Sequence, residues 1–425
     1  MKTILIITVG GSHEPIVASA KQDGPNKPDF VHFLCSADWG KTKGSYMQVE
    51  GPGMVNKSHF SQAQPDLPNI ITLAGLSAEQ CEVHKIEHFD DLDECYLTSL
   101  RLMERLHQEH PDARLIADYT GGTKSMTAGL AAAALDDRAC EIRLVAGLRQ
   151  NTEKVTSGTH FARPAKVWNT QVERRMRSAQ GLIERFDYAA AARLLEDTAA
   201  NFASEETISQ LQRWLTLCRA FDAWDRFEHG VARSLLQPYR SAFVPYAIFL
   251  DQVTDGEGYG FELVEDLLLN AKRRAAQRRF DDSVGRLYRA VELTAQVWLK
   301  TRHGIDAAHV DIKAVPEIMK ARIDSARRET GPIKISLLLA WDVIAALPGD
   351  SLGAFFEPQR SKVMDFLTLR NFSLFAHGLR PITEHDYNKT TVFVEGFVQG
   401  AIDLGLAALG KKRKSILHQL PIKWE

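Results

Sequence analysis

Apolar runs that alternate with helical patterns over about the first 165 residues are the feature that most limits the fold of this chain. Four runs have the length and composition of buried strands: 4–9, 30–34, 114–119 and 142–146. Helical patterns lie between them at 15–21, 92–107 and 126–135. Because apolar strands separated by helices form a parallel sheet covered on both faces, this part predicts a Rossmann-like α/β domain. Ligands of such domains bind beyond the carboxyl ends of the strands.

The rest of the chain is mainly helical in pattern. Residues 37–69 have no periodicity and predict a long surface loop or lid. Residues 279–292 loosely repeat the pattern of 184–194, which suggests a recurring helical hairpin. In the C-terminal part, six helices are expected at 263–276, 281–301, 315–328, 336–347, 359–376 and 385–409. We predict three domains: a Rossmann-like domain over 1–168, a helical connecting region over 169–260 and a helical bundle over 261–425.

Charge is divided unevenly along the chain, whose net charge is −2. Residues 1–262 hold 27 Lys and Arg against 35 Asp and Glu, whereas residues 263–425 hold 25 against 19. The C-terminal part is therefore the better candidate to meet a polyanion.

Cysteine and apolar patterns give expectations about metals and compartment. The five cysteines are scattered without C-x-x-C spacing, which favours reduced thiols. There is no H-E-x-x-H motif or Cys/His cluster, so we expect no metal site. No apolar run reaches the roughly 18–20 residues that cross a bilayer, and residues 1–10 predict a buried strand rather than an export signal. We expect a cytoplasmic protein without a membrane partner.

Two Gly-rich turns each link a predicted strand to a predicted helix, at 8–17 and 118–126. Free amides, hydroxyls and a lysine at the start of a helix favour an anion, phosphate above all. The second turn is not a Walker A loop because no glycine immediately precedes Lys124, and the first lacks G-x-G-x-x-G. The alternative is a pair of tight turns with capping Ser and Thr. The candidate ligand residues are Thr8, Gly10, Gly11, Ser12, His13, Thr120, Gly121, Gly122, Thr123, Lys124 and Ser125.

A second candidate site lies at 365–378, where apolar spacing predicts a helix that ends at Gly378. Seven residues span nearly two turns, so Arg370 and His377 would share one face of that helix. A permanent cation beside a proton carrier suits phosphodiester chemistry, with Asn371 as a residue that orients the histidine or the phosphate. The alternative for the pair is a capping or core-polar role.

These features together resemble the CARF-HEPN ribonucleases of type III CRISPR systems. The Thr8-to-Ser12 and Thr120-to-Lys124 turns resemble the ligand loops of CARF domains, which are Rossmann-like sensors. Arg370-Asn371-x5-His377 resembles the R-x4-6-H signature of HEPN domains, here with a spacer of six. Residues 268–274, followed by 286–292, are similar to the start of the helical bundle in one branch of that family. The order along the chain is also that of the family.

The resemblance implies an endoribonuclease that cyclic oligoadenylate activates when a type III complex detects foreign RNA. The activator would be a tetra- or hexa-adenylate ring bound by the candidate ligand residues, with no other cofactor. Two copies would meet as a homodimer and cleave single-stranded RNA without a metal. His377 would move the proton of the ribose 2′-hydroxyl or of the leaving 5′-oxygen, and Arg370 would bind the phosphate.

Other interpretations stay open at the level of sequence. The chain could be a CARF sensor or docking protein with an inactive bundle, or an enzyme that binds a nucleotide and acts on a small molecule. His13 and Lys124 could support slow cleavage of the activator. The cluster Arg286, Arg289 and Glu292 fits an ion-paired face better than a contact with RNA, and the run 411–414 is typical of a solvated basic tail.

Overall fold

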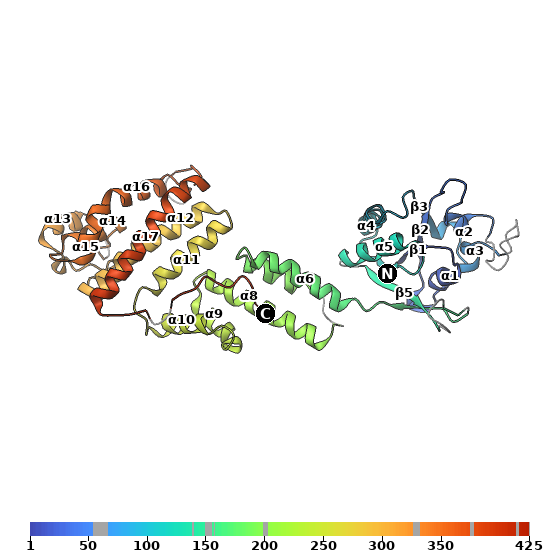
Figure 1. The fold of residues 1–425 in the computed structure, drawn as a ribbon, viewed down its shortest axis with the longest axis horizontal. Coiled ribbons are helices and arrows are strands. Elements are labelled where there is room, and N and C mark those ends of the chain that lie inside the picture. Colours follow the sequence, from blue (N-terminus) through green and yellow to red (C-terminus); the bar gives the residue numbers. More distant parts are fainter. Residues whose placement is uncertain are drawn as a thin grey trace. The chain divides into compact units, whose positions relative to one another are not determined.

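A computed structural model of the chain gives two compact units, residues 1–171 and residues 172–425 (Figure 1). The structure describes the chain apart from residues 54–66, 138–139, 149–154, 157, 199–202, 326–331, 375–377, 414–415 and 425. The boundary between the units lies within a helix that begins at Trp168.

The first unit is built on a six-stranded sheet in the order β3-β2-β1-β4-β5-β6, in which β6 alone runs antiparallel. The strands are β1 (Thr3–Val9), β2 (Phe30–Ser36), β3 (Cys81–Ile86), β4 (Arg114–Asp118), β5 (Glu141–Ala146) and β6 (Phe161–Pro164). The four predicted strands are confirmed, and so is the Rossmann-like plan. The two strands that sequence analysis missed are the edges of the sheet, where polar side chains interrupt the apolar signal.

Helices cover both faces of this sheet (Figure 1). Because side chains alternate along a strand, Ile4 and Ile6 of β1 face one layer, whereas Leu5 and Ile7 face the other. The first layer contains α4 (Leu92–Glu109) and α5 (Lys124–Asp136). The second contains α1 (Glu14–Ala20), α2 (Tyr46–Glu50) and α3 (Ile70–Ala74). The prediction of one long loop over 37–69 is wrong in part, because α2 lies inside that range and buries Val49 in the core.

The second unit begins with helices that share one apolar core: α6 (Trp168–Ile183), α7 (Tyr188–Glu196), α8 (Glu205–Asp225), α9 (His229–Leu236) and α10 (Val244–Asp255). Three helix-to-helix turns of this unit pass through a residue with positive φ, at Phe186, Phe227 and Arg278. In each, the following residue donates its N–H to a carbonyl five positions earlier, as in the Schellman motif. The recurring hairpin suggested by the sequence therefore exists, and Phe186, Phe227 and Arg278 occupy equivalent positions in its turns.

A bundle with its own core forms the rest of the second unit. Its helices are α11 (Glu262–Ala276), α12 (Phe280–His303), α13 (Glu317–Ser325), α14 (Leu337–Ala346), α15 (Ser351–Phe356), α16 (Arg360–Asn371) and α17 (Glu384–Leu409). Within the described residues, α17 is long and apolar enough to cross a membrane, as is the pair α14 and Ser351–Asn371 if it is taken as one span bent by 116°. Contrary to expectation, the chain thus has an apolar run of that length. The apolar residues of α17 form part of the core of the bundle, where Phe397, Val398 and Ala401 are buried.

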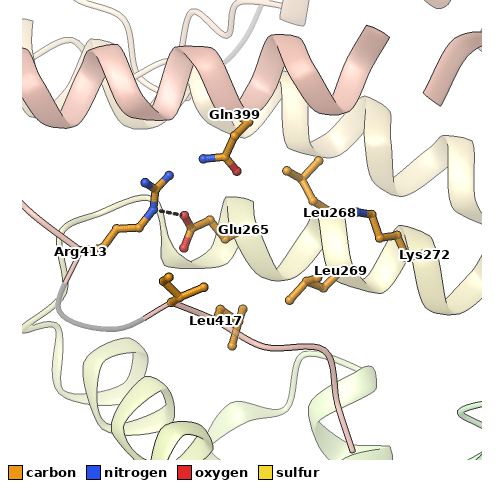
Figure 2. Close-up of a pocket in the computed structure, with 8 residues that line it drawn as sticks. Glu265, Leu268, Leu269, Lys272, Gln399, Arg413 and Leu417 are labelled. Atoms are coloured by element: carbon orange, nitrogen blue, oxygen red, sulfur yellow. Dashed lines mark hydrogen bonds and ion pairs between the residues drawn. The ribbon is translucent and has the colours of Figure 1, made fainter. Parts of the chain in front are cut away.

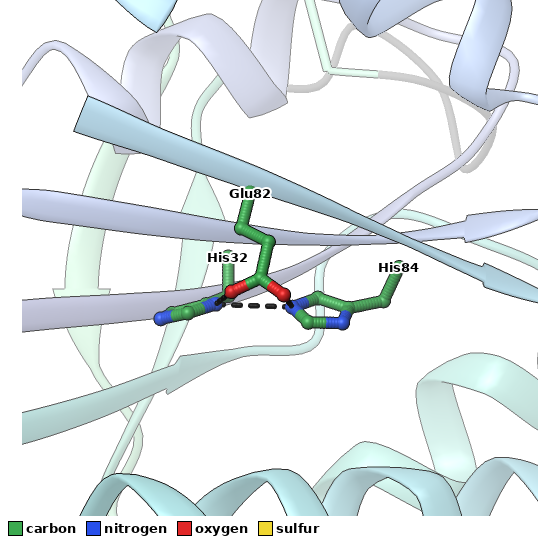
Figure 3. A group of neighbouring side chains, drawn as sticks. All are labelled: His32, Glu82 and His84. Atoms are coloured by element: carbon green, nitrogen blue, oxygen red, sulfur yellow. Dashed lines mark hydrogen bonds and ion pairs between the residues drawn. The ribbon is translucent and has the colours of Figure 1, made fainter. Parts of the chain in front are cut away.

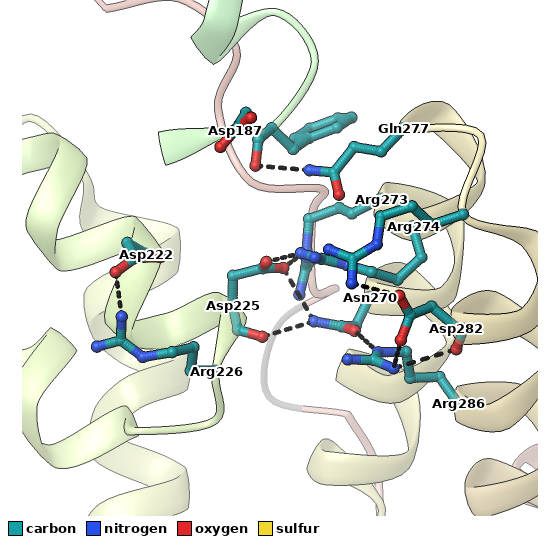
Figure 4. Close-up of polar contacts among 12 residues, drawn as sticks. Asp187, Asp222, Asp225, Arg226, Asn270, Arg273, Arg274, Gln277, Asp282 and Arg286 are labelled. Carbon is teal, nitrogen blue, oxygen red and sulfur yellow. Dashed lines mark hydrogen bonds and ion pairs between the residues drawn. The ribbon is translucent and has the colours of Figure 1, made fainter. Parts of the chain in front are cut away.

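Arg273 of α11 connects the two cores of the second unit through buried polar contacts (Figure 4). Its side chain is fully buried and donates to Asp225 at 2.7 Å and to Asp266 at 3.2 Å. Its third nitrogen donates to Gln419 of the C-terminal segment at 2.8 Å. Trp424 of that segment stacks on Phe221 of α8, so the segment packs as part of the core.

We expect Arg273→Leu to lower the free energy of unfolding by about 3–5 kcal/mol, because the buried carboxylate of Asp266 loses its arginine and Asp225 keeps only Arg274. Chemical denaturation followed by far-UV circular dichroism measures this loss. The matched control is Arg177→Leu, which removes an exposed arginine from α6 and should change stability by less than about 0.5 kcal/mol. Equal losses in the two variants would contradict the role given to Arg273.

Candidate functional site

The two Gly-rich turns lie against each other at the carboxyl ends of β1 and β4, which are neighbouring parallel strands. The hydroxyl of Thr8 donates to the carbonyl oxygen of Gly121 at 2.5 Å. A Cβ on Gly10 would lie 2.6 Å from the backbone nitrogen of Gly122, so a larger residue does not fit there. Gly122 has a φ of 96°, which side chains disfavour. The glycines thus let two distant parts of the sequence form one continuous surface.

Three hydroxyl groups of the second turn are bonded within the protein. Thr120 donates to the carboxylate of Asp118 at 2.5 Å. Thr123 donates to the carbonyl of Phe89 at 2.6 Å, and Ser125 donates to the carbonyl of Asp90 at 2.7 Å. With Thr8, these groups fix the shape of the turns in this structure, so their protons are not free for a ligand.

The remaining predicted ligand residues are Gly11, Ser12, His13 and Lys124. Gly11, Ser12 and Lys124 are exposed, and His13 is partly buried. Within the described part of the chain, the side chains of Ser12, His13 and Lys124 have no hydrogen-bond partner. Lys124 is also the first residue of α5, whose free N–H groups and positive dipole end favour an anion.

The buried carboxylate of Asp118 is hydrogen-bonded both to α1 and to the second turn. Asp118 is fully buried and accepts hydrogen bonds from Ser19 at 2.5 Å and from the backbone N–H of Thr120 at 3.0 Å. Burial raises the pKa of Asp118, although these hydrogen bonds and the nearby Arg143 oppose that shift. Burial lowers the pKa of Arg143, which donates to Gln22 at 2.7 Å. Sequence analysis did not assign these residues, although an Asp that ends an apolar strand is a signal for such a support.

An aromatic side chain lies beside the second turn. Trp39 is 67% exposed, and its ring meets the edge of Phe89 with centroids 5.9 Å apart. Phe89 is the residue whose carbonyl holds Thr123. Trp39 was placed in the predicted lid, but its exposed face next to the turn makes it a candidate to stack on a base.

The helix predicted to continue to residue 376 is shorter than expected, because α16 ends at Asn371. Asp281, in the first turn of α12, contacts the chain on both sides of residues 375–377. Its carboxylate accepts the backbone N–H of Leu374 at 3.4 Å and that of Ile382 at 3.1 Å. A long-range contact thus overrides the helical pattern of the sequence.

The prediction that Gly378 ends a helix is wrong for the same reason. A Cβ on Gly378 would overlap the carbonyl oxygen of Phe372, and the N–H of Arg380 donates to that oxygen at 3.3 Å. Gly378 therefore lets the chain at Arg380 pack closely against the end of α16. His377 lies outside the described residues.

Arg370 lies in the last turn of α16, half-buried, with its guanidinium over the ring of Tyr288 at 4.3 Å. It also donates to the side chain of Asn371 at 3.3 Å. In the described part of the chain no carboxylate pairs with Arg370. Other arginines of the bundle are paired with carboxylates: Arg286 with Asp282, Arg289 with Glu292, Arg360 with Glu357 and Arg380 with Asp386. The prediction of an ion-paired face at Arg286 and Arg289 agrees with these contacts.

Two cavities in the second unit flank its long helices. A groove of about 440 Å³ between α16 and α17 is lined by Lys362, Asp365, Leu369, Asp386, Lys389, Thr390 and Phe393. A smaller one of about 260 Å³ lies where the C-terminal segment crosses α11 and α17 (Figure 2). In it, Arg413 pairs with Glu265 at 2.5 Å and with Asp403 at 2.8 Å. Arg413 is therefore not part of a solvated basic tail, and Lys414 lies outside the described residues.

Known proteins match the chain both in its C-terminal bundle and over nearly its whole length. Residues 255–401 match the family of the Csm6 HEPN domain, a range that contains Arg370 and His377. The C-terminal part of this chain is thus similar to the HEPN domain of Csm6. No curated protein matches it in sequence. A similar solved structure is Enterococcus italicus Csm6 bound to cyclic hexa-2′-fluoro-hexa-dAMP, with a TM-score of 0.56 and 12% identity, over 97% of this chain and 96% of that chain.

The predicted fold class is thereby confirmed, and both matches support the predicted resemblance to CARF-HEPN proteins of type III CRISPR systems. The whole chain shares the fold of that Csm6, and the HEPN match runs from the end of α10 into α17. At 12% identity, the solved structure supports the fold of the whole chain and not the role of individual residues.

Because the two Gly-rich turns approach each other closely at Gly10, we expect Gly10→Ala to destabilise the first unit. Its free energy of unfolding should fall by about 1–3 kcal/mol, since the added methyl meets the backbone of Gly122. Thermal and urea unfolding measure the change. In the control, Gly181→Ala adds a methyl in open space on α6 and should stabilise by about 0.5–1 kcal/mol. If Gly10→Ala left the free energy of unfolding unchanged, the two turns would have to move apart without loss of stability.

Proposed function

We propose that the protein is a cytoplasmic, metal-independent endoribonuclease for single-stranded RNA, activated by cyclic oligoadenylate in type III CRISPR defence. The observation that carries the proposal is the state of Arg370 within the HEPN domain. It is held on Tyr288, next to the loop of His377, and has no carboxylate partner in the described part of the chain. Its charge is therefore available to a phosphate.

The reaction follows from these groups. His377 takes the proton of the ribose 2′-hydroxyl or gives one to the leaving 5′-oxygen, while Arg370 stabilises the charge on the phosphate. Asn371 accepts a hydrogen bond from Arg370 and so orients its guanidinium. Because the ribose supplies the nucleophile, the step needs no metal. The ring of Tyr288 restricts Arg370 and reduces the entropy lost when it binds the phosphate.

A second copy of the chain is proposed to complete the nuclease site. Three large apolar side chains in the loop beside Arg370 are exposed: Phe372 and Leu374 by 59% each, and Leu379 by 87%. Such a group next to a polar site is typical of a surface that a partner covers. In a symmetric dimer the same loop meets its copy, which brings two Arg370 and His377 pairs together.

The activator is proposed to bind at the CARF turns. Gly11 and Ser12, Lys124 and the first N–H groups of α5 offer charge and donors to its phosphates. Trp39 offers a face on which an adenine can stack. A tetra- or hexa-adenylate ring has repeated phosphates and adenines, which suits identical turns from two copies. The ring made by a type III complex would then link detection of foreign RNA to its cleavage.

Cleavage of a fluorescent single-stranded RNA, with activator and EDTA present, tests the nuclease. Arg370→Ala and His377→Ala should each lower the rate at least about 100-fold, since each removes one catalytic interaction. The matched control is Arg289→Ala, which removes an ion-paired arginine of α12 and should keep most of the activity. Full activity of the His377 variant, or loss of wild-type activity in EDTA, would refute this mechanism.

Activation by tetra- and hexa-adenylate rings, tested side by side, examines the sensor. Lys124→Ala and Trp39→Ala should raise the concentration needed for half-maximal activation about tenfold, because each removes a contact of about 1–3 kcal/mol. The cleavage rate at saturating activator should stay unchanged, since neither residue belongs to the HEPN domain. Lys166→Ala, an exposed lysine beyond the amino end of β5, is the control. Unchanged activation in both turn variants would place the ligand elsewhere.

A further inference from the structure

Three metal-binding side chains meet on one face of the CARF sheet: His32 of β2 with Glu82 and His84 of β3 (Figure 3). The pairing of the strands sets their positions, because His32 lies opposite Glu82 and Leu34 lies opposite His84. Side chains two residues apart point to the same face of a strand. The neighbours on this face, Leu34 and Ile86, are apolar and buried in the core under α4 and α5. The polar group is thus an exception in an apolar layer.

The donor atoms have the separations of a metal site. His32 Nδ1 lies 3.0 Å from His84 Nε2 and 3.4 Å from a carboxylate oxygen of Glu82. The other oxygen of Glu82 lies 3.7 Å from His84 Nε2. Two ligands bound at about 2.05 Å to a tetrahedral ion lie about 3.3 Å apart, in the middle of this range. We propose that His32, Glu82 and His84 bind a zinc ion that joins β2 to the edge strand β3.

The exposure of the group agrees with this site. The side chain of Glu82 is 45% exposed, whereas that of His32 is 4% exposed. Water can thus reach the open side as a fourth ligand.

The chemistry of the donors selects the metal. Two imidazole nitrogens and one carboxylate oxygen suit Zn²⁺, as in sites with two histidines and one glutamate. Mg²⁺ and Ca²⁺ prefer oxygen ligands throughout. Arg105 donates to Glu82 at 3.2 Å, and this contact fits the hydrogen-bonded partner that metal-binding carboxylates usually have. The site lies away from the carboxyl ends of the strands, so it is separate from the activator turns.

A zinc titration of untagged full-length protein, first dialysed against a chelator, tests the proposal. The wild type should retain one more Zn²⁺ per chain than Glu82→Gln and His84→Gln, as measured by elemental analysis after gel filtration. Added Co²⁺ should give visible absorption of a bound ion in the wild type and lose it in both variants. The melting temperature of the wild type should rise with Zn²⁺, because the ion binds the folded state.

His107→Gln is the matched control. His107 and Asp137 also form a histidine and carboxylate pair in the CARF unit, at 2.8 Å, but they supply two donors and not three. This variant should bind zinc like the wild type. Glu82 is an exposed edge residue, so Glu82→Gln should fold, and far-UV circular dichroism checks this without metal. Equal zinc content in the wild type, Glu82→Gln and His84→Gln would overturn the proposal, as would a wild type without zinc.

Discussion

The second unit depends on the burial of one cation. Arg273 has no contact with water and is held by Asp225 of α8, Asp266 of its own helix and Gln419 of the C-terminal segment. A buried guanidinium without these partners would be strongly unfavourable, so the three elements must meet at this point. Neighbouring contacts extend the network, because Asn270 of α11 accepts from Arg286 of α12 at 2.6 Å. The network therefore ends on α12, the helix whose Tyr288 lies under Arg370.

Helix α12 also contributes to the candidate site around Arg370. Its Asp281 accepts the backbone N–H groups of Leu374 and Ile382, and its Tyr288 lies under Arg370. Other arginines of the bundle pair with carboxylates, whereas the guanidinium of Arg370 lies over an aromatic ring that leaves its charge in place. The first unit shows a similar contrast. There, the hydroxyls of Thr8, Thr120, Thr123 and Ser125 are bonded internally, and the side chains of Ser12 and Lys124 have no partner within the described residues. At both candidate sites, a few polar groups thus remain available to a ligand.

In the sheet of the first unit, the edge strands differ in composition from the central strands. The central strands are apolar on both faces, so they were recognisable from their composition alone. The edge strand β3 carries Glu82 and His84, whose polarity hid the strand in the sequence. Paired with β2, these residues meet His32 and form a compact donor group. The irregularity that concealed the strand is therefore the same feature that suggests a metal site.

The sequence alone determined the local features: the Rossmann-like alternation, the two Gly-rich turns, the helical C-terminal part and the HEPN-like motif. They can be recognised because hydrophobic periodicity, glycine content and turn-forming residues are properties of a few neighbouring residues. Only the tertiary structure decided where α16 ends, since Asp281 is far from residues 374 and 382 in sequence and competes with their helical hydrogen bonds. It also decided which hydroxyls are free, that Arg370 lies over Tyr288 without a carboxylate partner in the described residues, and that His32 meets His84. Each of these depends on contacts between distant residues, and side-chain spacing along one chain does not encode them.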